Sequence, residues 1–446
     1  MSSNFIEKPR YQCALGGALV TVNAINRAVA IVHSAPGCAS AADGAAKSGS
    51  GYWGTSYCNG RATPSTNILE KEVIFGGESR LAEQIDSTLA IIDADLYAVI
   101  TGCMTDIIGD DVRSVAGRFQ AEGKPLVVAE TGGFKGNSAS GYDLILTALI
   151  EQVVEKGLAK VANQINLLGV IPTQDVFWRG NLLELKRLLT AVGLQVNTFF
   201  SPFDELSSLK TSSQAALTVV LSDVHGLEAA QAFKEVHGIP FVNMPLPIGP
   251  TATNAFLTEL AGYITIEPAV LAAVVQRETE WYYAYAEHVA ELYNDLDLQR
   301  FAIVVGDANY SYALTRFLAE DFGWIPYLVA VTDILDDAGK ARVAERFQSL
   351  PASLQPTLVF ETDTSRIETA LRQELAKEAD EYGSPIHPAF VLGSTWDRPL
   401  AQECKAGFLS VTYPVSNRVV TDQAYAGYRG GLHLATDILS TLISNR

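Results

Sequence analysis

Short runs of β-branched and apolar residues alternate along this chain with longer helical patterns, and this alternation limits the possible folds more than any other feature. The first such runs are 28–33, 96–101 and 125–130, with helical patterns at 79–93 and 110–122 between them. A repeated succession of strand, loop and helix is typical of a parallel sheet with helices on both faces. The sequence therefore predicts an α/β fold, in which ligands gather at the carboxyl ends of the strands.

The same alternation begins twice more along the chain. A second cycle starts with a strand pattern at 165–171, and a third starts at 301–309. We therefore predict three Rossmann-like modules, each a mostly parallel sheet flanked by helices, and the last one closed by a C-terminal helix at 430–444. The predicted modules are 1–160, 161–298 and 299–446.

The composition is that of an acidic globular protein. The chain has 446 residues, of which 48% are hydrophobic, and its formal net charge is −18. Proteins that bind nucleic acids carry basic patches or stripes, so a nucleic-acid partner is not expected. There is no leader in which charge precedes an apolar stretch, and no apolar run approaches the roughly 20 residues of a membrane span. We expect no membrane association and a cytoplasmic location.

Three of the five cysteines lie beside a glycine or in a turn-prone stretch, where predicted strands end or helices begin. Cys38 follows the run at 28–33, Cys103 follows the run at 96–101, and Cys13 precedes a helical pattern. In a large chain without a signal peptide, such residues are unreactive thiols, catalytic thiols or metal ligands, and not a disulfide framework.

The spacing of these cysteines differs from that of a zinc site. Zinc sites take four ligands, commonly in C-x-x-C pairs, whereas each thiol here lies on a separate loop. Iron–sulfur clusters do take thiolates from separate loops. From spacing alone, scattered buried cysteines remain the simpler interpretation. The chain has no G-x-x-x-x-G-K-[ST] loop, so it is not expected to hydrolyse ATP itself.

Several motifs combine glycine turns with cysteine, histidine and acidic residues. They are Gln12-Cys13, 33–38 (HSAPGC), 73–78 (VIFGGE), 102–111 (GCMTDIIGDD), 131–136 (TGGFKG) and 427–432 (GYRGGL). Taken together these motifs are specific, and in them the chain resembles the nitrogenase component 1 family, and within it the β-type subunit. The resemblance extends over essentially the whole sequence.

In that family, three cysteines of each subunit bind the P-cluster, an electron relay between the α-type and β-type subunits. The resemblance implies that Cys13, Cys38 and Cys103 are the ligands here. It also implies an [8Fe-7S] cluster shared with an α-type partner in an α2β2 heterotetramer, and an ATP-dependent iron–sulfur reductase that docks transiently. Cys58 matches a further β-chain cysteine that is not usually a ligand. Cys404 matches no ligand and is expected to be a plain buried thiol.

Three positions depart from the family pattern. Ser222 and Ala426 stand where α-type chains have the cysteine and histidine that hold the catalytic cofactor, so the resemblance implies that this chain relays electrons and has no catalytic residue of its own. Gly133 stands where molybdenum-type β chains have a serine that ligates the oxidised P-cluster. Together with the short segment before Cys13, this favours an alternative nitrogenase or a nitrogenase-like reductase, such as methylthio-alkane reductase, which cleaves C–S bonds.

Two other branches of the family remain open. One is a scaffold that assembles the cofactor without turning over substrate, and its β-like chain usually keeps fewer cluster cysteines. The other is the dark-operative reductase of a chlorophyll precursor, with a [4Fe-4S] cluster and an aspartate ligand. The presence of all three cysteines favours the electron relay over both.

Overall fold

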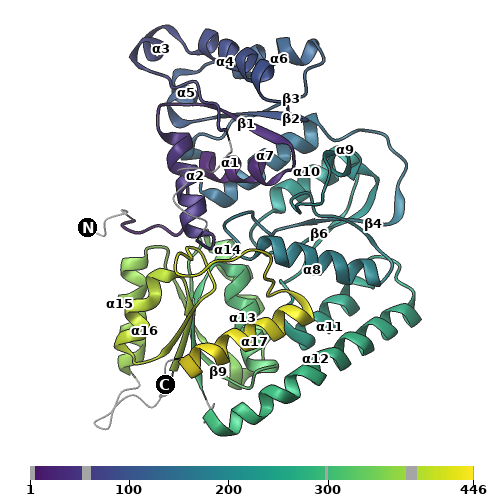
Figure 1. The fold of residues 1–446 in the computed structure, drawn as a ribbon, viewed down its shortest axis with the longest axis vertical. Helices are drawn as coiled ribbons and strands as arrows, with labels where there is room; N and C mark the ends of the chain where they lie inside the picture. The colour runs from purple at the N-terminus through teal and green to yellow at the C-terminus, as the bar shows by residue number, and fades with distance from the viewer. Residues whose placement is uncertain (1–5, 53–61, 297–299, 378–388, 445–446) are drawn as a thin grey trace.

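The computed structural model describes residues 6–52, 62–296, 300–377 and 389–444. Its strands form three sheets in which every strand pair is parallel, and helices cover the sheets. The predicted α/β fold with three mostly parallel sheets is therefore confirmed. In Figure 1 the first sheet lies at the top, the second at the right and the third below.

The first sheet has the order β1-β2-β3. Its strands are β1 (Ala28–His33), β2 (Leu96–Thr101) and β3 (Leu126–Ala129). Successive side chains of a strand point to opposite faces. Thus Ala98 and Ile100 face the main core, whereas Tyr97 and Val99 face a separate cluster. Two helices cover each face: α1 (Ala14–Ala24) and α7 (Ser138–Gln152) on one, and α4 (Glu78–Ile91) and α6 (Val112–Ala121) on the other.

Three short helices of this region lie near the carboxyl ends of its strands or beside them: α2 (Cys38–Gly49), α3 (Glu70–Phe75) and α5 (Cys103–Ile108). The helix predicted at 110–122 corresponds to α6, whereas no helix was predicted where α5 lies. The break between them is Gly109, which has a φ of +82° and ends α5 in the left-handed conformation that favours glycine.

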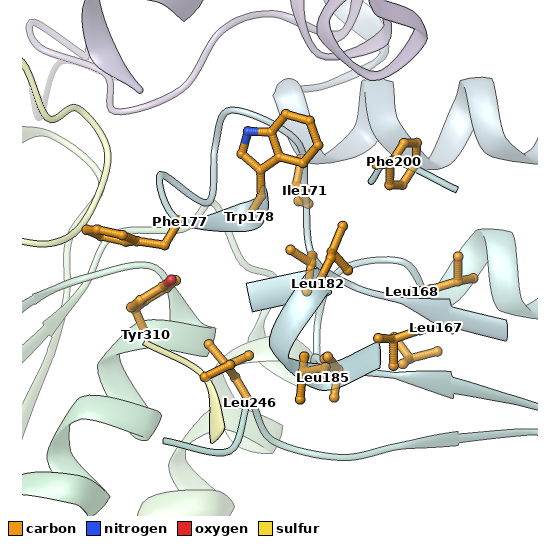
Figure 2. Close-up of a cluster of buried hydrophobic side chains, with 14 of the residues drawn as sticks. Leu167, Leu168, Ile171, Phe177, Trp178, Leu182, Leu185, Phe200, Leu246 and Tyr310 are labelled. Carbon is orange, nitrogen blue, oxygen red and sulfur yellow. The ribbon is translucent and has the colours of Figure 1, made fainter. Parts of the chain in front are cut away.

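The second sheet has the order β5-β4-β6-β7. Its strands are β4 (Val161–Leu168), β5 (Gln195–Asn197), β6 (Ala215–Val220) and β7 (Phe241–Asn243), and its helices are α8 (Trp178–Ala191), α9 (Leu206–Lys210) and α10 (Leu227–His237). Figure 2 shows Leu182 and Leu185 of α8 on the side toward Leu167 and Leu168 of β4, with Trp178 beside Ile171. This apolar contact holds α8 against the sheet.

The third sheet has the order β10-β9-β8-β11-β12. Its strands are β8 (Phe301–Gly306), β9 (Ile325–Val331), β10 (Thr357–Phe360), β11 (Ala389–Gly393) and β12 (Gly407–Ser410). Its helices are α13 (Ala308–Glu320), α14 (Asp337–Gln348), α15 (Thr364–Lys377) and α16 (Arg398–Glu403).

Three further helices lie beside the second and third sheets: α11 (Gly249–Leu260), α12 (Pro268–Leu296) and α17 (Gly427–Ser444). The C-terminal helix α17 packs against α8, α11 and α12 as well as β12, so its contacts are not confined to the third sheet. The division of the chain at residues 160 and 298 stays a prediction. No helix in the described parts of the chain is both long and apolar enough to cross a membrane.

Candidate functional site

The three predicted ligand cysteines all lie at the N-terminal ends of helices. Cys13 directly precedes α1, Cys38 is the first residue of α2, and Cys103 is the first residue of α5. The helices α2 and α5 follow neighbouring strands, because the last residue of β1, His33, pairs with the last residue of β2, Thr101. Each of these cysteines therefore lies where a helix N-terminus carries partial positive charge.

Gly133 lies between two of these thiols. A β-carbon built on Gly133 would be 3.0 Å from Cys103 Sγ and 3.6 Å from Cys13 Sγ, so both sulfurs lie within 4 Å of one point. The peptide N–H of Gly133 donates a hydrogen bond to Cys103 Sγ at 3.0 Å. Such bonds to a ligand sulfur stabilise the thiolate and influence the reduction potential of a bound cluster.

We call the edge of the first sheet that carries Cys13, Cys38 and Cys103 the cysteine edge. This edge is open to the surface. Cys13 and Cys103 are exposed and Cys38 is half-buried. Two apolar neighbours of Cys103, Ile107 and Phe134, are 75% and 62% exposed. Within the described ranges, no group of three or more His, Cys, Asp or Glu side chains is arranged to hold a metal ion. Two of the three thiols are therefore accessible from the surface, and the described residues form no closed single-ion site.

Of the other two cysteines, only Cys404 lies in the described part of the chain. Cys58 lies outside the described residues. Cys404 directly follows α16 and is half-buried against the apolar cluster of the third sheet, and burial, together with Glu403, raises the pKa of its thiol.

Cys13 is held by the segment 6–13, which we call the N-terminal strap. The guanidinium of Arg10 is 2% exposed and donates to the carboxylate of Asp397 at 2.7 Å and 2.5 Å. The carboxylate of Asp363 accepts hydrogen bonds from the N–H groups of Glu7 and Lys8. Gln174 donates to the carbonyl of Arg10. The position of Cys13 therefore depends on loops of the second and third sheets, which the sequence analysis missed.

His33 is buried directly beside the cysteine edge. Its Nε2 lies 3.0 Å from Asp110 Oδ2, and its Nδ1 lies 3.1 Å from Thr66 Oγ1. Burial lowers the pKa of His33, although the carboxylate of Asp110 opposes this shift. His33 is the last residue of β1 and thus belongs to the strand that leads to Cys38.

The positions that depart from the α-type pattern are filled by internal contacts. Ser222 and Ala426 are fully buried. The hydroxyl oxygen of Ser222 accepts the N–H groups of Val224 and His225, and the N–H of Ala426 donates to Asn181. The cavities beside the strand ends in this part of the molecule have volumes of about 40 Å³ and about 10 Å³. Such volumes accommodate one or two water molecules.

The larger of these cavities is lined by ionisable side chains. His225 Nε2 lies 2.7 Å from Asp333 Oδ1. Burial alone would lower the pKa of His225, but the carboxylates of Asp333, Asp307 and Asp143 together raise it. Burial raises the pKa of Asp175 to about 6, and burial with the charge of Asp333 also raises the pKa of Asp307. We call His225, Asp143, Asp175, Asp307 and Asp333 together the inner acidic cluster.

Comparison with known proteins identifies the family. The model of nitrogenase component 1 type oxidoreductases matches residues 13–443. The chain belongs to this family. The family predicted from the sequence is therefore confirmed.

The relatives within this family differ in their roles. The chain is 24% identical to the nitrogenase molybdenum-iron protein beta chain of Sinorhizobium fredii, with 98% of this chain and 84% of that protein covered. It is 25% identical to the cofactor biosynthesis protein NifE of Clostridium pasteurianum, with 97% and 87% covered. A solved structure titled nitrogenase Cp1 at pH 6.5 superimposes with a TM-score of 0.80 at 17% identity, covering 100% of this chain and 94% of that one. This structural likeness shows the fold.

Proposed function

We propose that this chain is the β-type subunit of a nitrogenase-like reductase. Cys13, Cys38 and Cys103 would supply half of the ligands of an [8Fe-7S] cluster at the interface with an α-type partner, in an α2β2 heterotetramer. The observation that carries the proposal is the cysteine edge itself. Three thiols lie at helix N-terminal ends, Cys13 and Cys103 are exposed, and the sulfurs of these two lie within 4 Å of one point.

The exposed apolar side chains around Cys103 support a partner on this face. Ile74 and Phe75 of α3 are 72% and 80% exposed, Ile107 of α5 is 75% exposed, and Phe134 is 62% exposed. Clusters of large exposed apolar residues mark surfaces that another protein covers. A partner subunit would bury part of this surface together with the cluster, and the ATP-dependent reductase would dock nearby.

The chain's own residues would prepare the site for electron transfer. When bound, the cluster supplies one-electron redox chemistry. The partial positive charge of the helix N-termini would offset the negative charge of a bound cluster, and the Gly133 N–H donates a hydrogen bond to Cys103 Sγ. Electrons from the reductase would pass through this site to a catalytic iron–sulfur cofactor in the α-type partner.

The filled positions at Ser222 and Ala426 support a relay role over a catalytic role. A multi-iron cofactor is far larger than the cavities of about 40 Å³ and about 10 Å³ beside these strand ends. The substrate would therefore be reduced in the partner. We propose a methylthio-alkane, with cleavage of its C–S bond, or dinitrogen. The glycine at position 133 is the feature of this chain that favours the former.

One alternative has support of its own. The likeness to NifE, at 25% identity over 97% of this chain, favours a cofactor-assembly scaffold as the second candidate. The chain is also 22% identical to one subunit of the light-independent protochlorophyllide reductase of Nostoc punctiforme, with 85% of this chain and 73% of that protein covered. This second likeness keeps a [4Fe-4S] cluster as an alternative cofactor.

Anaerobic co-purification with the α-type partner tests these alternatives. About eight irons per αβ interface would support the proposal, and about four would favour the scaffold or the [4Fe-4S] branch. Cys103→Ala should remove iron while the fold persists. Cys404→Ala, which changes a half-buried thiol far from the cysteine edge, should leave the iron content unchanged. Equal iron in both variants would refute the ligand assignment.

A further inference from the structure

Two glycine-containing turns beside the cysteine edge are joined by reciprocal hydrogen bonds. One turn, 76–78, connects α3 to α4, and the other, 109–111, connects α5 to α6. Asp110 Oδ1 accepts the N–H of Gly77 at 2.8 Å, and Glu78 Oε1 accepts the N–H of Asp111 at 3.0 Å. Each turn supplies one carboxylate and one N–H group, so a relative shift of the two turns breaks both bonds.

His33 extends this connection to Cys103. The carbonyl oxygen of His33 accepts the N–H of Gly102 at 2.9 Å and the hydroxyl of Thr105 at 2.8 Å, both at the start of α5. The side chain of His33 lies 3.0 Å from the carboxylate of Asp110, which follows the end of α5. One residue thus holds the helix that begins with Cys103 at both of its ends.

The contact between His33 and Asp110 is fully enclosed. Their side chains are 0% and 2% exposed. A β-carbon on Gly77 would lie 2.6 Å from Asp110 Oδ2 and 3.1 Å from His33 Cε1, so the turn has no room for a side chain. Removal of either partner would leave the other as a buried polar group without its hydrogen bond, which is costly.

We propose that His33 and Asp110 are positioning residues that couple the exposed helix α3 to the thiol of Cys103. The helix α3 carries Ile74 and Phe75 on the surface and packs beside α5 (Figure 1). A protein bound on α3 is thereby linked, through the turn at Gly77 and the carboxylate of Asp110, to the helix that presents Cys103. The role of this link in electron transfer rests on the proposed function, whereas the link itself is a property of this chain.

Hydrogen exchange of the purified full chain tests the link without iron. In Asp110→Ala, amide exchange should become about tenfold faster in both 70–77 and 102–109, as expected for the loss of a buried hydrogen bond. Alkylation of Cys103 by iodoacetamide should change at least about twofold relative to Cys13, because the hydrogen bond from Gly133 depends on the position of α5.

Two further variants make the test specific. Asp110→Asn keeps the volume and one acceptor for the Gly77 N–H, so it should give the same pattern with a smaller amplitude, and it replaces the alanine variant if that variant does not fold. His225→Gln removes the other buried His–Asp contact, between His225 and Asp333. It should leave exchange at 70–77 and 102–109 and the alkylation of Cys103 unchanged.

The outcomes separate this proposal from the proposed function. Faster exchange at 70–77 alone, or equal acceleration in His225→Gln, would overturn the coupling. In the anaerobically purified complex, Asp110→Ala should keep its iron but shift the electron paramagnetic resonance spectrum. A complex without iron in the unsubstituted protein would contradict the proposed function only, because the exchange and alkylation results stand apart from it.

Discussion

The cysteine edge of the first sheet and the inner acidic cluster are built on similar contacts but differ in their access to solvent. Each contains a buried His–Asp pair, His33 with Asp110 at 3.0 Å and His225 with Asp333 at 2.7 Å. The cysteine edge opens to the surface, where two thiols are exposed. The inner acidic cluster is largely buried and lines a cavity of about 40 Å³. The first region is the one where we propose a partner, whereas the second joins the chain's own sheets through the contact between His225 and Asp333.

The two histidines show what decides the charge of a buried pair. The pKa of His33 is lowered, because burial outweighs the single carboxylate with which its ring is in contact. The pKa of His225 is raised, because several carboxylates together outweigh burial. The pKa of His33 is thus lowered although Asp110 and Asp106 both oppose burial, whereas three carboxylates raise the pKa of His225.

The N-terminal strap runs between the two regions. Removal of its buried ion pair should have the largest effect on stability. Arg10→Ala leaves the carboxylate of Asp397 buried without its partner, which should lower the free energy of unfolding by about 3–5 kcal/mol. It should also loosen the segment that carries Cys13. Urea denaturation measures the stability, and alkylation of Cys13 measures the loosening.

Arg113 provides the control for this experiment, because its ion pair with Glu130 is on the surface. Arg113→Ala should change stability by at most about 1 kcal/mol. A loss in Arg10→Ala no larger than the loss in Arg113→Ala would mean that the strap does not anchor Cys13.

The inner acidic cluster should make stability depend on pH. The pKa of Asp175 in the folded chain is about 6, above the usual value of 3.8. The folded state then binds the proton more tightly than the unfolded state, so the contribution of Asp175 is fully present below pH ~4 and is lost as the pH rises through 6. Relative to Asp175→Asn, the unsubstituted protein should lose about 3 kcal/mol of unfolding free energy between pH 4 and pH 7.

Urea denaturation at several pH values gives this difference directly. Asp86→Asn, a substitution on the exposed face of α4, should run parallel to the unsubstituted protein at all pH values. If the free energy of unfolding of Asp175→Asn had the same pH dependence as that of the unsubstituted protein, Asp175 would not bind a proton more tightly in the folded state.

Surface substitutions at the cysteine edge should instead weaken binding of the proposed α-type subunit. Ile107→Asp places a charge on the exposed apolar face beside Cys103 and should weaken binding of the α-type subunit by about 30-fold, or ~2 kcal/mol. Isothermal titration calorimetry would measure this affinity. Ile91→Asp makes the same change at a residue that is 81% exposed at the end of α4, next to the start of β2 and away from the cysteines. Equal weakening in both variants would contradict a partner at the cysteine edge.

Local patterns in the sequence predicted what local backbone geometry determines. The strands at 28–33 and 96–101 have the predicted bounds, because their apolar pattern is continuous and ends at a turn. The positions of Cys38 and Cys103 at one sheet edge follow from the same periodicity, since parallel neighbours end together.

The contacts that hold the candidate site depend on residues far apart in the chain. His33 and Asp110 are 77 positions apart, and Arg10 and Asp397 are 387 positions apart. No periodicity or composition relates such residues, and in the sequence each of them is an ordinary polar residue. The motifs 73–78 and 102–111 marked the two joined turns in the sequence, but the hydrogen bonds between them appear only when the helices are packed.

The smallest expected effect concerns the space at Gly133. In Gly133→Ala the new methyl group would lie 3.0 Å from Cys103 Sγ and 3.2 Å from Cys13 Cβ, so the cysteines must move by a few tenths of an ångström. We expect a stability change within about 1 kcal/mol and a two- to threefold change in the alkylation rate of Cys103. Gly117→Ala in α6 meets no atom within 4 Å and should stabilise the chain by about 0.5–1 kcal/mol without affecting Cys103. Unchanged alkylation in Gly133→Ala would show that this glycine does not set the position of the Cys103 thiol. The cysteine edge would then have room for a small side chain at position 133.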